Sequence, residues 1–275
     1  MEEKVKNMNN KIGFIGSGKM ANAIIKGIID SKHYCADNIF VSDLNQETLD
    51  KIQKEFGLNT TTDNKNVIKN ANVIVMAVKP FILKEVLEAI KNEITKDHLI
   101  ISIAAGISIK DIQTIIPNTP VIRVMPNTPA LVNEGMSAIC KGDYTKENHS
   151  KLAVEIFKSV GKVIESEEKF IDIITAISGS GPAFYYYIID EIAKAGEKLG
   201  LDYETCLRLS AQTAYGSAKM IMETQTSPEQ LITNVTTPGG CTAVGNDLLK
   251  NSDISKVLYD TIEGTMKKAK SLGEK

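Results

Sequence analysis

The chain has 275 residues, of which 43% are hydrophobic and 24% charged, so it can bury a sizeable core and is not a disordered protein. Its 32 Lys and Arg against 34 Asp and Glu give a formal charge of -2, without the basic excess typical of nucleic-acid binding. The four cysteines lie far apart, the three histidines form no zinc pattern, and no apolar run approaches the ~18 residues that span a bilayer. We therefore expect a cytoplasmic protein with free thiols, no metal site, and neither nucleic acid nor membrane as a partner.

Residues 1–10 are polar and are predicted to form a flexible leader. From residue 11 to residue 166, short runs rich in Ile and Val alternate with helical patterns, which predicts a Rossmann-type, doubly wound parallel sheet of the α/β class. The expected strands are Lys11–Ile15, Asn38–Ser42, Val73–Val78, Leu99–Ile103, Val121–Val124 and Met136–Cys140. The expected helices between them are Lys19–Ser31, Gln46–Phe56, Ile82–Glu93 and Ile109–Ile116.

The pattern changes near residues 165–170. Apolar residues then recur with a helical period over 182–199, 203–223 and 255–272, and no further strand is expected. Residues 167–275 are therefore predicted to form a second, all-α domain.

The first expected strand leads into a Gly-x-Gly-x-x-Ala sequence made of Gly16, Gly18 and Ala21. In a dinucleotide-binding loop the first glycine permits the turn, the second admits a pyrophosphate, and the small third residue lets the helix pack on the strand. The start of that helix presents free N–H groups to the phosphates. A purely structural turn is the alternative.

Asp43 follows the second expected strand, where an acid often binds the adenosine ribose of NADH. No arginine comes directly after it to receive the phosphate of NADPH. Asp43 can also be read as the cap of the next helix, so the choice between NADPH and NADH stays open.

Two later strand ends, Ala77–Pro80 and Ala104–Gly106, fall at the sheet edge where ligands lie in open α/β folds. At this edge Lys79 either belongs to the ligand site or is simply a lysine exposed to solvent. The three small residues Ala104–Gly106 permit close approach to a flat ring or simply form a turn.

The segment Asn234–Thr242 interrupts a helical region with three threonines, a proline and two adjacent glycines. Freed backbone N–H groups at Gly239 and Gly240, together with hydroxyls such as that of Thr237, are suited to hold a small carboxylate. Cys241 has no base beside it in sequence, so a catalytic thiol is not favoured. The chain also shows no obvious general-base histidine, which hydride transfer to a C=N bond tolerates better than ketone reduction does.

Six segments in this order resemble the pyrroline-5-carboxylate reductases, from Lys11 to about Leu272. They are GFIGSGKMA at 13–21, AVKP at 77–80, SIAAG at 102–106, RVMPNTPALV at 123–132, SGSGPAF at 178–184 and NVTTPGGCT at 234–242. The resemblance implies a Rossmann domain followed by a helical dimerisation domain, a homodimer or larger homo-oligomer, and hydride transfer from NADPH or NADH to 1-pyrroline-5-carboxylate, giving L-proline.

The resemblance also assigns site residues. It implies cofactor binding by Ile15, Gly16, Ser17, Gly18, Lys19, Met20, Asn64, Ala77, Val78, Lys79, Pro80, Ala104, Ala105 and Gly106. Its substrate positions are Glu168, Asn234, Gly239, Gly240, Cys241 and Thr242, with Thr242 as the catalytic residue that hydrogen-bonds the imine nitrogen.

Two other functions remain to be weighed against this one. A β-hydroxyacid dehydrogenase would need a catalytic lysine on the first long helix of the second domain, where Lys194 stands without a glycine-rich setting. A non-catalytic NAD(P) sensor would keep the glycine loop but would not need the Thr237–Thr242 segment.

Overall fold

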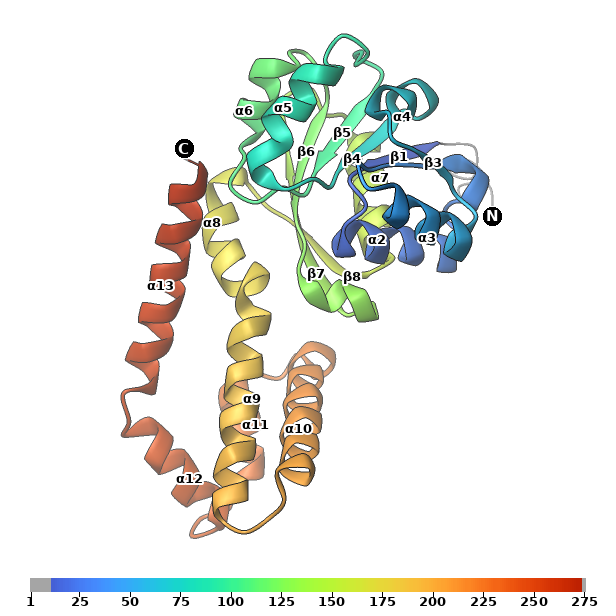
Figure 1. The fold of residues 1–275 in the computed structure, drawn as a ribbon. Coiled ribbons are helices and arrows are strands. Elements are labelled where there is room, and N and C mark those ends of the chain that lie inside the picture. Colours follow the sequence, from blue (N-terminus) through green and yellow to red (C-terminus); the bar gives the residue numbers. More distant parts are fainter. Residues whose placement is uncertain (1–10, 274–275) are drawn as a thin grey trace. The chain divides into compact units, whose positions relative to one another are not determined.

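The computed structural model describes residues 11–273, so the predicted leader at 1–10 lies outside the described residues. Within that range eight strands form one sheet in the order β3-β2-β1-β4-β5-β6-β7-β8 (Figure 1). Their bounds are β1 Ile12–Ile15, β2 Ile39–Ser42, β3 Asn59–Thr61, β4 Val73–Met76, β5 Leu99–Ser102, β6 Val121–Met125, β7 Gly135–Lys141 and β8 Gly161–Glu165.

The strands β1 to β6 run parallel, as predicted, but β7 is antiparallel to β6 and parallel to β8. The predicted doubly wound sheet is therefore mostly parallel, with an antiparallel pair at β6 and β7. The connection from β6 to β7 holds only the short 3-10 helix η2 (Thr128–Val132), and a parallel return would need a crossover of about a dozen residues or more.

Helices cover both faces of the sheet because its central strands are apolar nearly throughout. One core contains buried residues from α2 (Lys19–Asp30), α3 (Gln46–Phe56) and α7 (Glu147–Lys158). The other contains residues from α4 (Asn64–Asn70), α5 (Pro80–Ile90) and α6 (Ile109–Ile115). These two layers are the doubly wound arrangement that the alternating pattern predicted.

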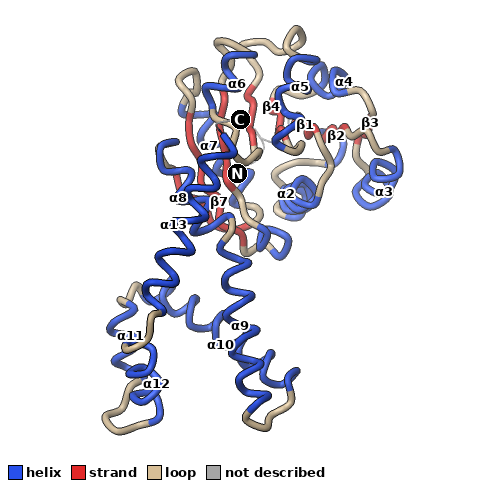
Figure 2. Tube along the Cα trace, turned by 60° about the vertical axis from the view of Figure 1, so that its left-hand side comes forward, coloured by secondary structure: helices blue, strands red, loops and turns tan. Residues whose placement is uncertain are grey.

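Beyond the sheet, the short elements η3 (Glu168–Phe170) and α8 (Ile171–Ile174) lead into a π-helical turn at Thr175–Gly179. The described helices that follow are α9 Gly181–Lys198, α10 Tyr203–Thr224, α11 Pro228–Val235, α12 Cys241–Lys250 and α13 Ile254–Gly273. Figure 2 shows only helices and loops in this later part of the chain.

The described part of the chain divides into two compact units, one made of residues 11–180 with 265–273 and the other of residues 181–264. The first unit extends to Ser180, beyond the predicted boundary at 166/167, because η3, α8 and the π-helical turn pack with the sheet. Within unit 1, Ile171 of α8 is buried in the same core as residues of α5 and α6. The end of the last helix also belongs to this unit.

The helical unit buries little of its own apolar surface. Its long helices α9 and α10 bury only Gly181, Ala193, Cys206 and Ser210, and no residue of α11 or α12 is buried. Large apolar side chains with 60% or more of their surface exposed are Tyr185, Tyr186, Tyr187, Leu199, Met222, Val235, Val244, Leu248 and Tyr259. Apolar surface on this scale is a feature of chains that associate.

Candidate active site

The glycine loop packs against the backbone that follows β4. Gly16 has φ +96°, and a Cβ built there would lie 2.8 Å from the carbonyl carbon and oxygen of Ala77 and 3.0 Å from the nitrogen of Val78. The structure thus brings together the predicted segments Ile15–Met20 and Ala77–Pro80, between the neighbouring strands β1 and β4. The order of strands reverses at this point, which is where nucleotides bind in doubly wound sheets.

Gly18 has a different surrounding from Gly16. No atom lies within 4 Å of a Cβ built on Gly18, so the fold itself does not require a glycine there. Gly18 is also the N-cap residue of α2, and its absent side chain leaves the first N–H groups of that helix uncapped. Open space in front of uncapped N–H groups is the arrangement that a pyrophosphate requires.

Asp43 is bound to the same loop. Its Oδ2 accepts hydrogen bonds from the backbone nitrogen and the hydroxyl of Ser17, at 2.9 and 2.5 Å, and its Oδ1 accepts one from the nitrogen of Asn45 at 3.0 Å. Burial opposes ionisation, but these hydrogen bonds outweigh it and lower the pKa of Asp43. The cap of α3 is instead Asn45, which accepts from Thr48, so the helix-cap interpretation of Asp43 is wrong.

The remaining predicted cofactor residues lie at the same edge of the sheet. Asn64 begins α4, and its Oδ1 accepts a hydrogen bond from the hydroxyl of Ser42 at the end of β2, at 2.7 Å. Lys79 is the exposed N-cap residue of α5 and Pro80 is its first residue. Ala104–Gly106 begins two residues after the end of β5, with Ala104 buried and Gly106 at φ +75°.

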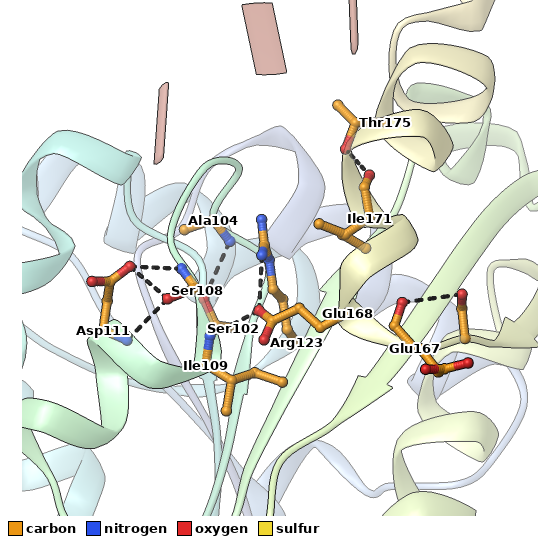
Figure 3. A network of polar contacts seen from close by, with 11 residues as sticks. Ser102, Ala104, Ser108, Ile109, Asp111, Arg123, Glu167, Glu168, Ile171 and Thr175 are labelled. Carbon is orange, nitrogen blue, oxygen red and sulfur yellow. Dashed lines mark hydrogen bonds and ion pairs between the residues drawn. The ribbon is translucent and has the colours of Figure 1, made fainter. Parts of the chain in front are cut away.

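Glu168 reaches from η3 towards β6 and the start of α6, as Figure 3 shows. Its Oε1 accepts a hydrogen bond from Nη1 of Arg123 on β6 at 2.8 Å and another from the backbone nitrogen of Ile109 at 2.9 Å. Sequence reasoning did not single out Arg123 as the partner of Glu168. The available signal was a charged residue inside β6, a strand buried at every position.

The predicted substrate segment lies in the helical unit and forms a tight turn. The N–H of Gly240 donates to the carbonyl of Thr237 at 2.9 Å, and Gly239 has φ +72°. Pro at the second and Gly with positive φ at the third position are typical of a type II turn. Because the N–H of Gly240 is already bonded, donation from it to a substrate carboxylate requires this bond to be shared.

The turn leads straight into α12. Gly240 is the N-cap residue and offers no side chain, so Cys241 and Thr242 stand in a first turn whose N–H groups precede the helix's own hydrogen bonds. Both side chains are exposed, as is Asn234, whose Oδ1 accepts from Gln230 at 2.8 Å. The structure therefore groups the predicted substrate residues of 234–242, and places Glu168 in the sheet unit instead.

Lys194, which the dehydrogenase alternative would need, is held by two acidic residues on the same helix. Its Nζ lies 2.6 Å from Asp190 and 2.9 Å from Glu191, and hydrogen bonds to these carboxylates raise the pKa of Lys194. A lysine that holds its proton more tightly is a weaker proton donor.

Two further observations concern the part of the chain that the structure describes. No described helix is long and apolar enough to cross a membrane. No group of three His, Cys, Asp or Glu side chains among these residues is arranged to hold a metal ion.

Comparison with known proteins covers almost the whole chain. The family model for pyrroline-5-carboxylate reductase dimerisation matches residues 168–272, and that for NADP oxidoreductase, coenzyme F420-dependent, matches residues 11–106. A pyrroline-5-carboxylate reductase of Methanosarcina acetivorans is 38% identical over 97% of this chain and 99% of its own length.

Two solved structures are also similar to this chain over nearly its whole length. The pyrroline carboxylate reductase of Plasmodium falciparum, with NADP bound, is 34% identical with a TM-score of 0.86 and covers 97% of this chain and 99% of its own. A pyrroline-5-carboxylate reductase of Coxiella burnetii is 35% identical with a TM-score of 0.91 and covers 96% of this chain and 98% of its own. The chain therefore belongs to the pyrroline-5-carboxylate reductase family.

Proposed function

We propose that this protein reduces the C=N bond of 1-pyrroline-5-carboxylate with NADH or NADPH and releases L-proline. The observation that carries the proposal is the match to this family along nearly the full chain, with both the glycine loop and the Asn234–Thr242 segment in place. When bound, the cofactor supplies a hydride to the imine carbon. The chain's own residues must hold the two reactants, exclude water and hydrogen-bond the imine nitrogen.

The cofactor's pyrophosphate is proposed to lie at Gly18 and the start of α2. The space beside Gly18 and the uncapped N–H groups of α2 fit a doubly charged diphosphate. Ala77–Pro80 and Ala104–Gly106, at the ends of β4 and β5, would line the rest of the cofactor site. Small residues at both positions leave room for a flat ring against the backbone.

The substrate is proposed to bind at the turn before α12. The open first turn of this helix suits the carboxylate, and the hydroxyls of Thr237 and Thr242 are exposed beside it. A threonine hydroxyl both donates and accepts, so Thr242 can hydrogen-bond the nitrogen whether or not it is protonated. Thr242 therefore aligns the imine, and the protonated C=NH+ group becomes the secondary amine when its carbon accepts the hydride, so the step needs no further proton.

The preferred cofactor is proposed to be NADH. The lowered pKa of Asp43 keeps it ionised at neutral pH, at the end of β2 where an adenosine ribose is expected. A carboxylate there accepts hydrogen bonds from ribose hydroxyls and repels a 2′-phosphate. The next residue, Leu44, is 87% exposed and carries no charge to attract that phosphate.

The working form is proposed to be a cytoplasmic homodimer, or a larger homo-oligomer, built on the C-terminal helices. The exposed apolar side chains of α9, α11 and α12 are the surface that a second copy would cover. All four cysteines are free, two of them exposed, which suits a reducing compartment.

The purified protein should oxidise NADH when 1-pyrroline-5-carboxylate is supplied and form one proline for each cofactor consumed. The measurement is the loss of absorbance of the reduced cofactor together with amino-acid analysis of the product. Controls omit the imine or replace it with a β-keto acid. Oxidation with the β-keto acid but not with the imine would contradict the proposed substrate.

Gly18→Val should weaken cofactor binding at least about tenfold while the protein stays nearly as stable as the wild type, because the new side chain extends into the phosphate space and its Cβ meets no protein atom within 4 Å. Titration of NADH fluorescence gives the dissociation constant, and thermal melting gives the stability. The comparison variant is Gly16→Ala, which should lower the melting temperature because its Cβ meets the backbone of Ala77. Unchanged NADH affinity in Gly18→Val would refute the phosphate assignment.

Asp43→Asn combined with Leu44→Arg should shift the ratio of kcat/KM for NADPH over NADH by about 10- to 100-fold towards NADPH, the range expected for one charge-assisted hydrogen bond. Asparagine keeps an acceptor for Ser17, so the loop should stay in place. Asp50→Lys, on the exposed side of α3, is the control with the same change of two charge units. If the ratio moves equally in both proteins, Asp43 does not set the preference.

Thr242→Ala and Thr242→Val should each lower kcat/KM for the imine by roughly 10- to 100-fold, because a hydrogen bond to a charged group is lost. Affinity for NADH should be unchanged, and Thr242→Ser should recover most of the activity. Thr233→Ala, which removes an exposed hydroxyl bonded to the carbonyl of Glu229, is the control. A full rate in Thr242→Val would remove this hydroxyl from the mechanism.

A further inference from the structure

A single carboxylate oxygen joins three separate parts of the sheet unit. Oε1 of Glu168, in η3, accepts from Nη1 of Arg123 on β6 and from the backbone nitrogen of Ile109 at the start of α6 (Figure 3). The Glu168 side chain is 30% exposed, and that of Arg123 is only 5% exposed. The contact is thus a partly buried ion pair that also caps a helix.

Arg123 depends on this partner. A buried guanidinium that loses its anion becomes an uncompensated charge. The residue opposite Arg123 on β7 is Cys140, and burial raises the pKa of this thiol to about 11, so it is neutral and cannot replace Glu168. Nε of Arg123 already lacks a hydrogen-bond partner, which leaves little tolerance for losing the bond from Nη1.

The two partners of Glu168 stand at opposite ends of the loop between β5 and α6. Arg123 is paired in register with Ser102, the last residue of β5, whose hydroxyl accepts from the nitrogen of Ala104 at 3.4 Å. Ile109 is the first residue of α6, directly after its capping residue Ser108. Between these two points lies Ala104–Gly106, the segment assigned above to the cofactor.

We propose that Glu168 is a positioning residue that fixes the loop Ala104–Gly106 against the cofactor, through its bonds to Arg123 and to the nitrogen of Ile109. The inference rests on the proposed function, because it takes this loop to line the cofactor site. It gives Glu168 a role different from the substrate contact that the family resemblance implies. This role follows from the positions of the two hydrogen-bond donors, Arg123 and the nitrogen of Ile109, at the two ends of the loop.

The two roles predict different kinetics. A positioning residue acts on the cofactor, so its loss should weaken NADH binding in the absence of substrate and lower kcat, while KM for the imine stays the same. A substrate contact should do the reverse, raising KM for the imine with NADH affinity unchanged. NADH binding is measured without turnover, so it reports on the loop even if the protein acts on another imine.

The first test compares Glu168→Ala, Glu168→Gln and Glu167→Ala in the full-length protein. Glu168→Ala should weaken NADH binding several-fold and lower kcat about 10- to 100-fold, as expected for a displaced reactant. Glu168→Gln keeps an oxygen that accepts from both partners and should recover most of both values. Glu167 is the adjacent acid, paired only at the exposed surface with Lys169, so Glu167→Ala should resemble the wild type.

A second pair of variants removes only one of the bonds and serves if Glu168→Ala does not fold. Ile109→Pro deletes the N–H that donates to Glu168, at a helix position where proline is tolerated and after a residue, Ser108, with extended φ -79° and ψ 160°. Ile109→Ala keeps the N–H while also shortening the buried side chain. Weaker NADH binding in the proline variant than in the alanine variant supports the proposal.

Three results would overturn the proposal. They are unchanged NADH affinity in Glu168→Ala, a rise confined to KM for the imine, and equal NADH affinity in the two Ile109 variants. If the wild-type protein itself binds no NADH, the cofactor assignment fails and the proposal fails with it. Failure of the proposed function is therefore recognised in the wild type, and failure of this inference in the variants.

Discussion

The close approach between two backbone segments at the centre of the sheet determines where everything else in the sheet unit stands. Gly16 passes so near Ala77 and Val78 that no side chain can be placed between them. This contact holds the loop after β1 beside the loop after β4, at the point where the strand order turns. The hydrogen bonds of Ser17 to Asp43 add the end of β2 to the same edge. A parallel sheet in which neighbouring strands end together thus forms a site from segments far apart in sequence.

The sequence predicted the apolar parts of this architecture well and the polar parts less well. The strands β1, β2, β4, β5, β6 and β7 were all expected, because runs of Ile and Val are typical of buried strands. The edge strand β3, Asn59–Thr61, was missed because it is short and polar. The helix α7, with the sequence ENHSKLAVEIFK, was also missed, although its buried residues Ala153, Ile156 and Phe157 follow a helical period. The reversal of β7 depends on the length of a connection and not on any residue preference.

The residues of the candidate site differ in the same way in how far the sequence predicted them. Glycine loops and strand ends could be located because their backbone requirements leave a mark on the sequence, as Gly16 does. The partner of Glu168 could not be found this way, since Arg123 and Glu168 are 45 positions apart and only the fold brings them together. Likewise the division between units lies at Ser180 because α8 packs into the sheet unit, and that packing follows from tertiary contact.

The difference in attachment between Asp43 and Leu44 has an evolutionary consequence. Leu44 is almost fully exposed, so exchanging it costs the fold nothing, whereas Asp43 supports the glycine loop through Ser17. Under the proposed cofactor assignment, a lineage changing its dinucleotide would therefore have an accessible first step at position 44. At position 43 it could use only residues that still accept a hydrogen bond. Under the proposed role of Asp43, the choice between NADH and NADPH can thus change through surface substitutions, without reorganising the core.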